Sequence, residues 1–563
     1  MLHVSIIVEL LRARPALTVG IPAGIQALVW TLVPGWFYSG PPGSLPMVLA
    51  IGHEFQLGTY LGPPLAFWLA EIVFRLSGRS LFAVYLLSQI CVVVTYWAVF
   101  TLGRAIVGAQ QAAIAVLLMV GISSFTLATP EFGPIILTMP LWAATLLHYW
   151  RVVAERRSVY KFALAADVAL ILLTTYAGVI LVGLLVAFTC ANARTRALLR
   201  ATDLWLAGLA AAILLVPHLF WIVQTSDELL PALARLRSAD AVIGNFTGWL
   251  RQLALLVGAH AGLIVLIGIV IAWPGAEREL APVIVGRPVE PFARRFVYFF
   301  ALMPAFLATI VGVVGALPAP LGGVAPLIVL SGLAVVVAAG DAIALCHQRL
   351  AIAAWFGLLF APPALAVLAL LILPWLGVDL AINQPADAMA RFFADSFQRR
   401  LGKELPIVAG DPRTAALVEV GAASRPSLFL DATPARSPWV SMRDVMAKGA
   451  IVVWPTTDTA GTPPPDVKER FPDLVPEVPR AFERAVQGGL PLLRIGWAVI
   501  RPQAPQEPAA AGRPSPGPSP SPSLSQCPGK VCPCESEGGH RFSDKGPLTP
   551  VDKLRLGRDW RHA

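Results

Sequence analysis

The chain has 563 residues, of which 56% are hydrophobic and 14% are charged, whereas an ordinary soluble protein has about 45 to 50% and about 25%. This balance excludes a soluble enzyme. The formal net charge of +9 comes mostly from short loops between apolar runs, which is typical of membrane topology and does not indicate nucleic-acid binding. Apolar runs recur from Thr18 to Leu373, and most are near the roughly 20 residues that cross a bilayer, so we predict a polytopic α-helical membrane protein.

Alternating basic loops predict how the spans are oriented. Arg12 and Arg14 precede the first apolar run, so the N-terminus is expected in the cytoplasm. The 29-residue run at 162–190 has basic loops at both ends, which predicts two short helices bent near residues 174–178. With this pair, we predict about eleven membrane helices, the last of which ends outside. The predicted spans are 17–38, 81–102, 106–128, 134–150, 162–190, 203–223, 251–273, 297–315, 325–340 and 351–376.

Three parts are predicted along the chain: a transmembrane catalytic domain at 1–378, a small periplasmic α/β domain at 379–502 and a disordered Pro/Ser-rich tail at 503–563. An amphipathic segment at 65–76, too short to span, is expected in the first outer loop. In the α/β domain, strands are predicted at 405–408, 427–430, 450–454 and 492–500, and helices at 386–401, 412–420, 441–447 and 478–487.

The tail contains the one cluster of potential metal ligands. Cys527, Cys532, Cys534 and His540 form a C-x4-C-x-C-x5-H pattern, whose spacing matches no standard zinc site. The other cysteines lie in or beside apolar runs and predict no disulfide framework. The N-terminus has no cleavage signal of the A-x-A kind, so the first apolar run is expected to remain as an anchor.

Several enzyme signatures are absent from the sequence. It contains no Walker-type phosphate loop, no G-x-G-x-x-G after a strand and no G-x-S-x-G elbow. His53-Glu54 begins like H-E-x-x-H, but Leu57 stands where the second histidine would be, which excludes a zincin. An ATP-driven or nucleotide-sugar enzyme of the soluble type is therefore not expected.

The first outer loop carries the most informative motif. Residues 51–69 read IGHEFQLGTYLGPPLAFWL, with an acidic residue shortly before a P-P-L-x-x-W element. This order resembles glycosyltransferase family 39, a group of integral-membrane enzymes that includes protein mannosyltransferases, lipid A aminoarabinose transferases and rhizobial core-polysaccharide transferases. The segments LTTYAG at 173–178, VAGD at 408–411 and SPW at 437–439 are also similar to members of this group, and the resemblance covers about residues 15–502.

The resemblance implies a GT-C type fold in the bacterial inner membrane. It also implies transfer of a hexosyl or pentosyl unit, with inversion, from a polyprenyl-phosphate donor to lipid A, another glycan or a protein at the periplasmic face. A carboxylate near an apolar boundary gains basicity by desolvation and can take the acceptor's proton. Glu54 is the candidate for this base, and His53 could assist it, orient the acceptor or help to bind a divalent cation, whose need stays open.

Other residues of the outer loops are candidates for substrate binding. The family's first loop commonly opens with Asp-Glu, where this chain has Gly52-His53-Glu54, so the role of the Asp has passed to Glu54 or is lost. Related aminoarabinose transferases carry Lys before P-P-L, where this chain has Gly62. The alternatives for each candidate are a solvated carboxylate, an interfacial anchor or a snorkelling arginine. The candidates are Pro63, Pro64, Trp68, Arg75, Arg79, Glu131, Arg235 and Arg237.

Two further classes of function stay open at this point. A transporter or flippase for a lipid would show internal inverted repeats and charges in mid-membrane, but the sequence has no convincing repeat and its candidate acids cluster at the outer edge. The altered Asp-Glu position also leaves room for an inactive relative that keeps the fold as a scaffold.

Overall fold

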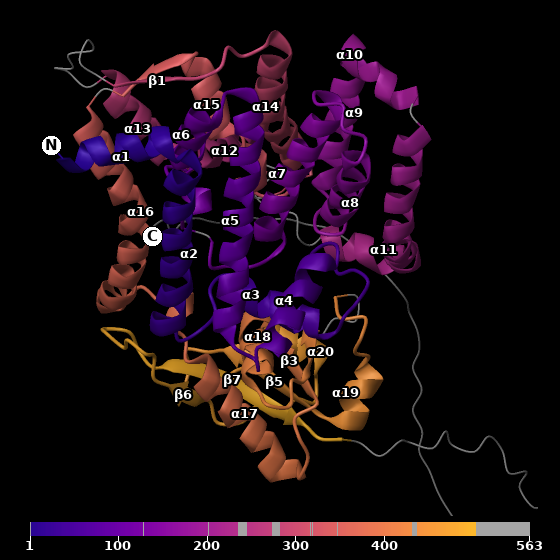
Figure 1. The fold of residues 1–563 in the computed structure, drawn as a ribbon. Coiled ribbons are helices and arrows are strands. Elements are labelled where there is room, and N and C mark those ends of the chain that lie inside the picture. The colour runs from indigo at the N-terminus through magenta and orange to yellow at the C-terminus, as the bar shows by residue number, and fades with distance from the viewer. Residues whose placement is uncertain are drawn as a thin grey trace, which may run out of the picture. The chain divides into compact units, whose positions relative to one another are not determined.

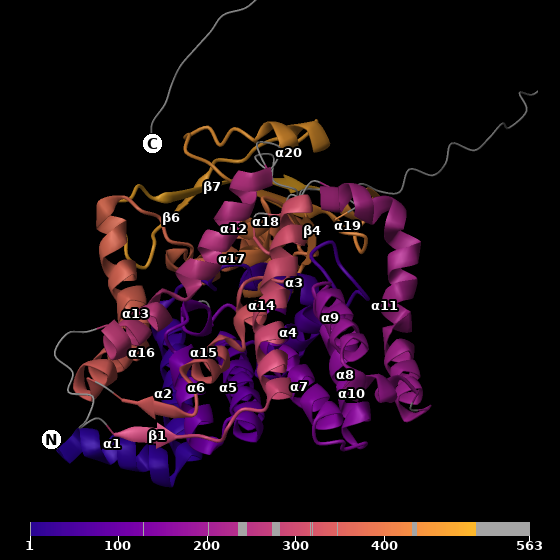
Figure 2. The same cartoon turned by 90° about the horizontal axis from the view of Figure 1, so that it is seen from above.

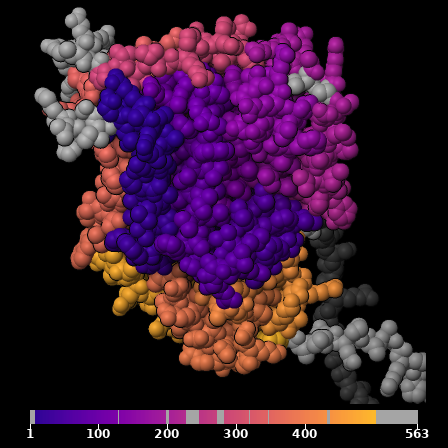
Figure 3. All heavy atoms as spheres, viewed as in Figure 1, coloured from indigo at the N-terminus to yellow at the C-terminus, as the bar shows by residue number. Residues whose placement is uncertain are grey.

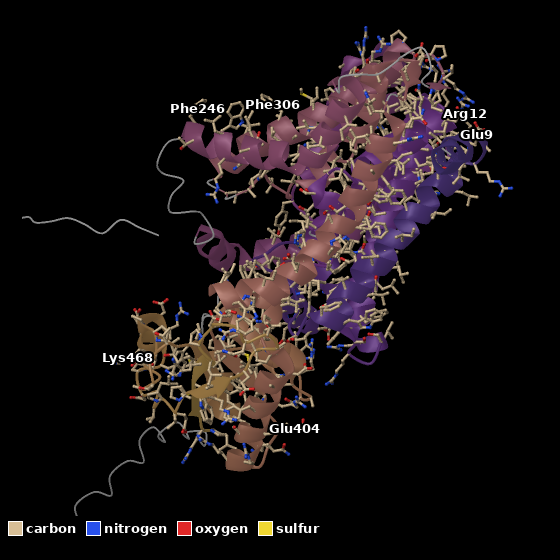
Figure 4. The ribbon with its side chains drawn as sticks, turned by 90° about the vertical axis from the view of Figure 1, so that its left-hand side faces the viewer. Glu9, Arg12, Phe246, Phe306, Glu404 and Lys468 are labelled. Carbon is tan, nitrogen blue, oxygen red and sulfur yellow. The ribbon has the colours of Figure 1, made fainter. Side chains whose placement is uncertain are left out.

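The computed structural model describes residues 2–502 except 128, 201, 235–244, 273–281, 316, 318, 346 and 431–435. These residues belong to one compact unit, in which a helical bundle carries a five-stranded sheet and its helices at one end (Figure 1). We call this the domain end of the bundle and the opposite one the far end. Glu404 lies at the domain end, and Glu9 and Arg12 lie at the far end (Figure 4). The predicted fold class, a polytopic helical membrane protein with a C-terminal α/β domain, is confirmed.

The bundle agrees closely with the predicted spans. Among the described residues, five helices are long and apolar enough to cross a membrane, and a sixth span is formed if a pair bent by 53° at residue 260 is counted as one. Shorter apolar helices occupy the other predicted spans, so the count roughly fits the prediction. The bundle helices are α2 (Pro15–Phe37), α5 (Leu81–Ile106), α6 (Ala109–Met119), α7 (Pro134–Val153), α8 (Tyr160–Leu172), α9 (Gly178–Ala191), α11 (Thr202–Ala234), α12 (Asn245–Ala259), α13 (Ala261–Ala272), α14 (Pro291–Val314), α15 (Ser331–Ala339) and α16 (Gln348–Ile372).

The predicted broken pair is present as α8 and α9. The turn between them lies at the domain end, where the backbone carbonyl of Leu173 accepts a hydrogen bond of 2.9 Å from the N–H of Leu65. Non-helical backbone at membrane depth is tolerated when protein groups satisfy it. This contact also brings two motifs of the sequence, the P-P-L element and LTTYAG, next to each other.

Two of the short helices that were not predicted lie near the first span. α1 (Leu2–Ala13) precedes the first span, and α3 (Leu45–His53) lies in the first loop. Seven of the nine residues of α3, all between Leu45 and Gly52, are buried, and they lie on all sides of the helix. Its sequence therefore lacks the amphipathic period by which a helix is recognised. The predicted amphipathic segment at 65–76 is confirmed as α4 (Leu65–Leu76).

The C-terminal sheet has the strand order β4-β3-β5-β7-β6. β3 (Ile407–Gly410) pairs in parallel with β4 (Ser427–Leu430) and β5 (Ala450–Pro455), and β7 (Leu493–Ile500) is antiparallel to β5 and β6 (Arg480–Phe482). β3, β4, β5 and β7 confirm the four strands that were predicted. The sheet helices are α17 (Ala386–Leu401), α18 (Pro412–Gly421), α19 (Met442–Lys448) and α20 (Pro465–Arg470), and a two-stranded sheet at the far end consists of β1 (Val283–Val285) and β2 (Ala342–Ala344).

One predicted element of this domain is wrong. Residues 478–487 were expected to form a helix, but Arg480–Phe482 forms the edge strand β6. Its register places Phe482 opposite Leu493 of β7, and the Phe482 side chain is buried. Packing of Phe482 on the sheet thus overrides the local helical preference of this polar segment.

In Figure 2 the sheet and its helices lie together at the domain end, seen from a perpendicular direction. The predicted disordered tail and its Cys/His cluster lie outside the described residues.

Candidate functional site

Loops from distant parts of the chain meet at the domain end. The loop after α2 contacts the loop before α7: the backbone N–H of Ser44, in the first of these loops, donates to the carboxylate of Glu131, in the second. The turn after α8 contacts the start of α4 through Leu65 and Leu173. Residues of the C-terminal domain pack onto these loops, so the predicted site residues of the first and second outer loops are brought to one end of the bundle.

Glu131 is held at the N-terminus of α3. Its Oε1 accepts hydrogen bonds from the backbone N–H of Ser44 at 2.6 Å and from the Ser44 hydroxyl at 2.8 Å. A carboxylate is favoured at this end of a helix because the first N–H groups are unpaired and the helix dipole is positive there. The side chain is only partly buried. Glu131 is therefore a fixed carboxylate that solvent can still reach.

Gly43 allows this close approach of Glu131. Its φ is +49°, and a Cβ at this position would lie 1.9 Å from Cδ of Glu131. Glycine is the residue that meets both requirements, since it adopts positive φ without strain and has no side chain to collide.

Arg413 of α18 clamps the same loop from the C-terminal domain. Its Nη1 donates to the Gly43 carbonyl at 2.6 Å, and its Nη2 donates to the carbonyls of Pro41 and Ala381 at 3.3 Å each. Burial lowers the pKa of Arg413, and the nearby Glu131 carboxylate opposes this effect. No sequence motif predicted a role for Arg413, which lies 370 positions from Gly43 in the chain.

Glu54, the base proposed from the sequence, lies at the other end of α3. It is the C-cap residue of that helix, and nine residues at a rise of about 1.5 Å separate it by roughly 13 Å from the Ser44 end. Its carboxylate faces the edge strand β4, where it is hydrogen-bonded by the Ser427 side chain and the Leu428 backbone. Burial raises the pKa of Glu54, and those hydrogen bonds and the charges of His53 and Arg425 oppose the rise.

A buried ionic cluster surrounds Glu71 of α4, next to Glu54. The Glu71 carboxylate contacts Arg75 Nε at 2.5 Å, Arg425 Nη2 at 2.7 Å and His53 Nδ1 at 3.3 Å. Burial alone would raise the pKa of Glu71, but the hydrogen bond to His53 and the charges of Arg425 and Arg75 together lower it. His53 and Arg75, both predicted as site residues, are therefore partners of this carboxylate.

Glu419 of α18 completes the cluster. Its Oε1 lies 3.1 Å from Arg425 Nε, and its side chain is fully buried. Burial raises the pKa of Glu419 to about 8, with the Arg425 charge opposing the rise and the Glu71 and Glu54 charges adding to it. Three carboxylates thus share one buried arginine, Arg425, which links the first loop to the C-terminal domain.

The P-P-L element and the loop before it are anchored from three directions. Pro63 and Pro64 are buried, and Trp68 Nε1 donates to the Gln56 carbonyl at 2.9 Å, which gives these residues a structural role in shaping the loop. From α11, His218 Nδ1 lies 2.8 Å from the Leu57 carbonyl oxygen.

Arg436 is a further residue at this loop that the sequence analysis missed. Its Nη2 donates to the Tyr60 hydroxyl at 2.8 Å, and its guanidinium lies over the Tyr60 ring at 4.3 Å from the centroid. Tyr60 is two residues before Gly62, the position where related transferases carry Lys. Arg436 stands directly before the SPW segment at 437–439, which was the one available signal.

The remaining predicted arginines are not gathered at one point. Arg79 Nη1 donates to the Ala423 carbonyl at 2.7 Å, so Arg79 holds the loop that precedes β4. Arg235 and Arg237 lie outside the described residues. Within residues 2–502 as described, no group of three or more His, Cys, Asp or Glu could hold a metal ion.

The bundle has a broken helix pair, loops bearing carboxylates at one end and an α/β domain at the same end, which agrees with the fold expected from the resemblance. Residues 62–221 match the family model described as dolichyl-phosphate-mannose-protein mannosyltransferase. This range includes Glu131 and begins eight residues after Glu54. The match agrees with the resemblance expected from the sequence: over these residues the chain is similar to glycosyltransferase family 39. No curated protein sequence matches the chain.

Solved structures of GT-C proteins are similar to this one. ArnT from Cupriavidus metallidurans, in a crystal structure bound to undecaprenyl phosphate, has a TM-score of 0.50 at 16% identity, over 86% of this chain and 98% of that chain. Arabinofuranosyltransferase AftD from Mycobacteria has a TM-score of 0.44 at 14% identity, over 86% of this chain and 40% of that chain. Archaeal oligosaccharyltransferase AglB from Archaeoglobus fulgidus has a TM-score of 0.41 at 14% identity, over 76% of this chain and 65% of that chain. The likeness to ArnT shows a shared fold.

Proposed function

We propose that the protein is an integral-membrane glycosyltransferase that moves a sugar from a polyprenyl-phosphate donor to an envelope acceptor such as lipid A, another glycan or a protein. The observation that supports this most strongly is the fold shared with ArnT over 86% of this chain and 98% of that one, in a structure that holds undecaprenyl phosphate. Because a fold alone does not define a reaction, the family-model match over residues 62–221 is the second support.

In the proposed reaction, an acceptor oxygen attacks the anomeric carbon of the donor sugar. The new carbon–oxygen bond forms as the bond to the phosphate oxygen breaks, the polyprenyl phosphate leaves as an anion, and the acceptor's proton passes to a carboxylate. A single displacement of this kind inverts the anomeric configuration. The protein must therefore supply an ionised carboxylate within reach of the acceptor and a cation for the leaving phosphate.

Glu131 is the carboxylate that the geometry supports best. It is fixed by two hydrogen bonds from Ser44 at the N-terminus of α3 and is partly exposed. Glu54 is the second candidate: its raised pKa suits a base, but one of its oxygens is enclosed without a hydrogen-bond partner among the described residues.

Arg436 is the proposed partner of the donor phosphate. A planar guanidinium suits a phosphate, since two N–H groups can bind two of its oxygens. The side chain is held over Tyr60 beside the P-P-L element, so its charge lies close to the residue that replaces the lysine of related transferases.

The domain end is proposed to face the periplasm. Arg104 and Arg151 lie in the last turns of α5 and α7, and Arg156 and Arg157 lie in the loop after α7. Arg194 lies in the short helix α10 (Ala193–Arg196), at the same far end. An excess of arginine in short loops marks the cytoplasmic side of a membrane protein. This supports a cytoplasmic N-terminus and a periplasmic C-terminal domain.

The test is transfer of labelled sugar from polyprenyl-phosphate donors by the full-length protein in membrane vesicles. Glu131→Gln and Glu54→Gln each remove one carboxylate charge at nearly constant size, and Glu404→Gln is the control on the exposed surface of the same end. We expect Glu131→Gln to lower the rate about 100- to 10,000-fold, the usual contribution of a general base, with Glu404→Gln unchanged.

The other outcomes separate the remaining hypotheses. A comparable loss confined to Glu54→Gln would assign the base to that residue. Absence of transfer by the native protein with mannosyl, aminoarabinosyl and galacturonosyl donors would contradict the enzyme. A lipid transporter or an inactive scaffold would then be favoured, the latter because Gly52-His53-Glu54 stands where the family commonly has Asp-Glu.

A further inference from the structure

An apolar cavity lies at the far end of the bundle, away from the loops described above. It has a volume of about 560 Å³, is partly open, and is lined by residues of α1, α2, α6, α13, α15, α16 and β2. The helices among these elements lie beside one another in both ribbon views (Figures 1 and 2). Its wall is aliphatic and aromatic, as at Leu11, Ile21, Val336 and Trp355.

The few polar groups of the wall are directed to backbone carbonyls. The Thr18 hydroxyl donates to the Arg14 carbonyl at 3.2 Å, and Trp355 Nε1 donates to the Leu117 carbonyl at 2.8 Å. Water needs two to four polar partners to occupy a cavity, and an apolar cavity of about 150 Å³ already takes up benzene in preference to water. A cavity several times larger, in a membrane protein, is suited to a hydrocarbon chain.

Helix α1 forms the membrane-surface wall of this cavity. Ile7, Val8 and Leu11 line the cavity, whereas Glu9 and Arg12 are exposed on the other side and form an ion pair of 3.1 Å (Figure 4). A helix with one apolar and one charged face lies in the plane of the membrane interface, where lipid head groups meet acyl chains. In the space-filling view the indigo N-terminal residues lie at the upper left of the bundle (Figure 3). The cavity therefore lies at the depth of the acyl chains of one leaflet.

Two exposed arginines stand at the edge of the cavity. Arg14 lies at the corner between α1 and α2, between the lining residues Leu11 and Leu17, and Arg349 follows the lining residue Gln348. Of the acids at this edge, Glu9 is paired with Arg12, and Asp341 precedes the lining residue Ala342, so the two arginines outnumber the one remaining acid. The edge thus offers positive charge at head-group depth above an apolar interior.

We propose that this cavity binds an anionic phospholipid of the far-side leaflet, with one acyl chain inside the cavity and the phosphate at Arg14 and Arg349. Both parts of such a molecule are complemented, since the apolar wall packs against the acyl chain and each arginine attracts the phosphate. The site lies at the opposite end from the proposed sugar transfer, so the proposal does not depend on that activity.

The test uses the full-length protein in nanodiscs that contain phosphatidylglycerol with a photoactivatable group near the end of one acyl chain. Crosslinked peptides are then identified by mass spectrometry. Ala351→Phe and Ala339→Phe each fill the cavity from a different helix, whereas Ala353→Phe is the matched control, because Ala353 is exposed on α16 and does not line the cavity. All three must keep the thermal stability of the native protein to be compared.

We expect crosslinks concentrated on α1, α2 and α16, reduced at least fivefold by Ala351→Phe or Ala339→Phe and unchanged by Ala353→Phe. Arg14→Gln and Arg349→Gln should each weaken retention of phosphatidylglycerol about fivefold relative to phosphatidylcholine. Crosslinks spread evenly over the lipid-facing helices, insensitive to the filling variants, would overturn the proposal. Preferential crosslinking of a polyprenyl-phosphate probe at these peptides would also overturn it, since the occupant would then be a donor lipid.

Discussion

The guanidinium of Arg425 and the carboxylate of Glu71 form a buried ion pair of 2.7 Å between residues that are 354 positions apart in the chain. Their side chains are only 5% and 1% exposed. The pair joins α4, in the first loop of the bundle, to the C-terminal domain. It therefore fixes the position of the loops that carry the candidate site relative to the sheet.

We expect Arg425→Met to destabilise the folded protein strongly. Methionine fills a similar volume without the charge and leaves Glu71 and Glu419 buried beside a neutral side chain. Removing one partner of a buried ion pair costs about 3 to 5 kcal/mol, since the other charge stays uncompensated. Thermal unfolding of the full-length protein in detergent measures this as a lowered Tm.

The matched control is Arg400→Met, on the surface of the same domain. Arg400 pairs with Glu477, and both side chains are more than a third exposed, so loss of this pair changes stability by about 1 kcal/mol or less. If Arg425→Met lowered the Tm by no more than Arg400→Met, the cluster would have no structural role.

The buried carboxyl of Glu419 predicts a pH dependence of stability. Its pKa is raised from an ordinary value of 4.5 to about 8, so between these values the folded state holds a proton that the unfolded state has released. Stability from this group is fully present below pH 4.5 and is lost as the pH rises through about 8. The slope is at most about 1.4 kcal/mol per pH unit.

Glu419→Gln isolates this contribution. Because glutamine does not titrate, the Tm of the Glu419→Gln variant should fall less between pH 5 and pH 8 than the Tm of the native protein. Glu404→Gln serves as the exposed control. Parallel curves for the native protein and Glu419→Gln over this pH range would show that the Glu419 pKa is not raised.

Gly43→Ala should disrupt the candidate site through Glu131. A methyl group at residue 43 would overlap the Glu131 carboxylate, so the carboxylate must move away from Ser44. A misplacement of about 1 Å at a reacting group can cost 100-fold in rate, and we expect a loss of that order in the sugar-transfer assay. Gly78→Ala is the control: Gly78 also has a positive φ, but nothing lies within 4 Å of its added Cβ. Equal activity of the two variants would rule out a role for the Gly43 contact.

The sequence predicted the fold well where single segments decide it. The amphipathic pattern of α4, the basic residues on both sides of α8 and α9, and the apolar strands of the sheet are local signals, and each element lies where it was expected. β6 was mistaken for a helix because Phe482 takes its place from packing on β7, which a local pattern does not contain.

The candidate site was predictable only in part. The short helix α3 has no amphipathic period, so Glu54 was placed at the start of the first loop when it lies at the end of a helix within it. Arg413, Arg425 and Arg436 reach the first loop from more than 340 residues away, and only their packing in three dimensions shows that they do. Glu131 was recognised as a possible acid, but its contact with Ser44 was not predictable from spacing.

Arg436→Gln tests the proposed phosphate partner. A hydrogen bond to a charged group contributes about 1.5 to 3 kcal/mol, so we expect kcat/KM for the polyprenyl-phosphate donor to fall about 10- to 100-fold, because the charge on the phosphate grows as it leaves. Arg443→Gln, on the exposed face of α19, is the matched control and should leave kcat/KM unchanged. Tyr60→Phe removes the hydroxyl that binds Arg436 and keeps the ring beneath it, so a smaller loss is expected there. If Arg436→Gln lost no more activity than Arg443→Gln at equal Tm, another cation would have to bind the phosphate.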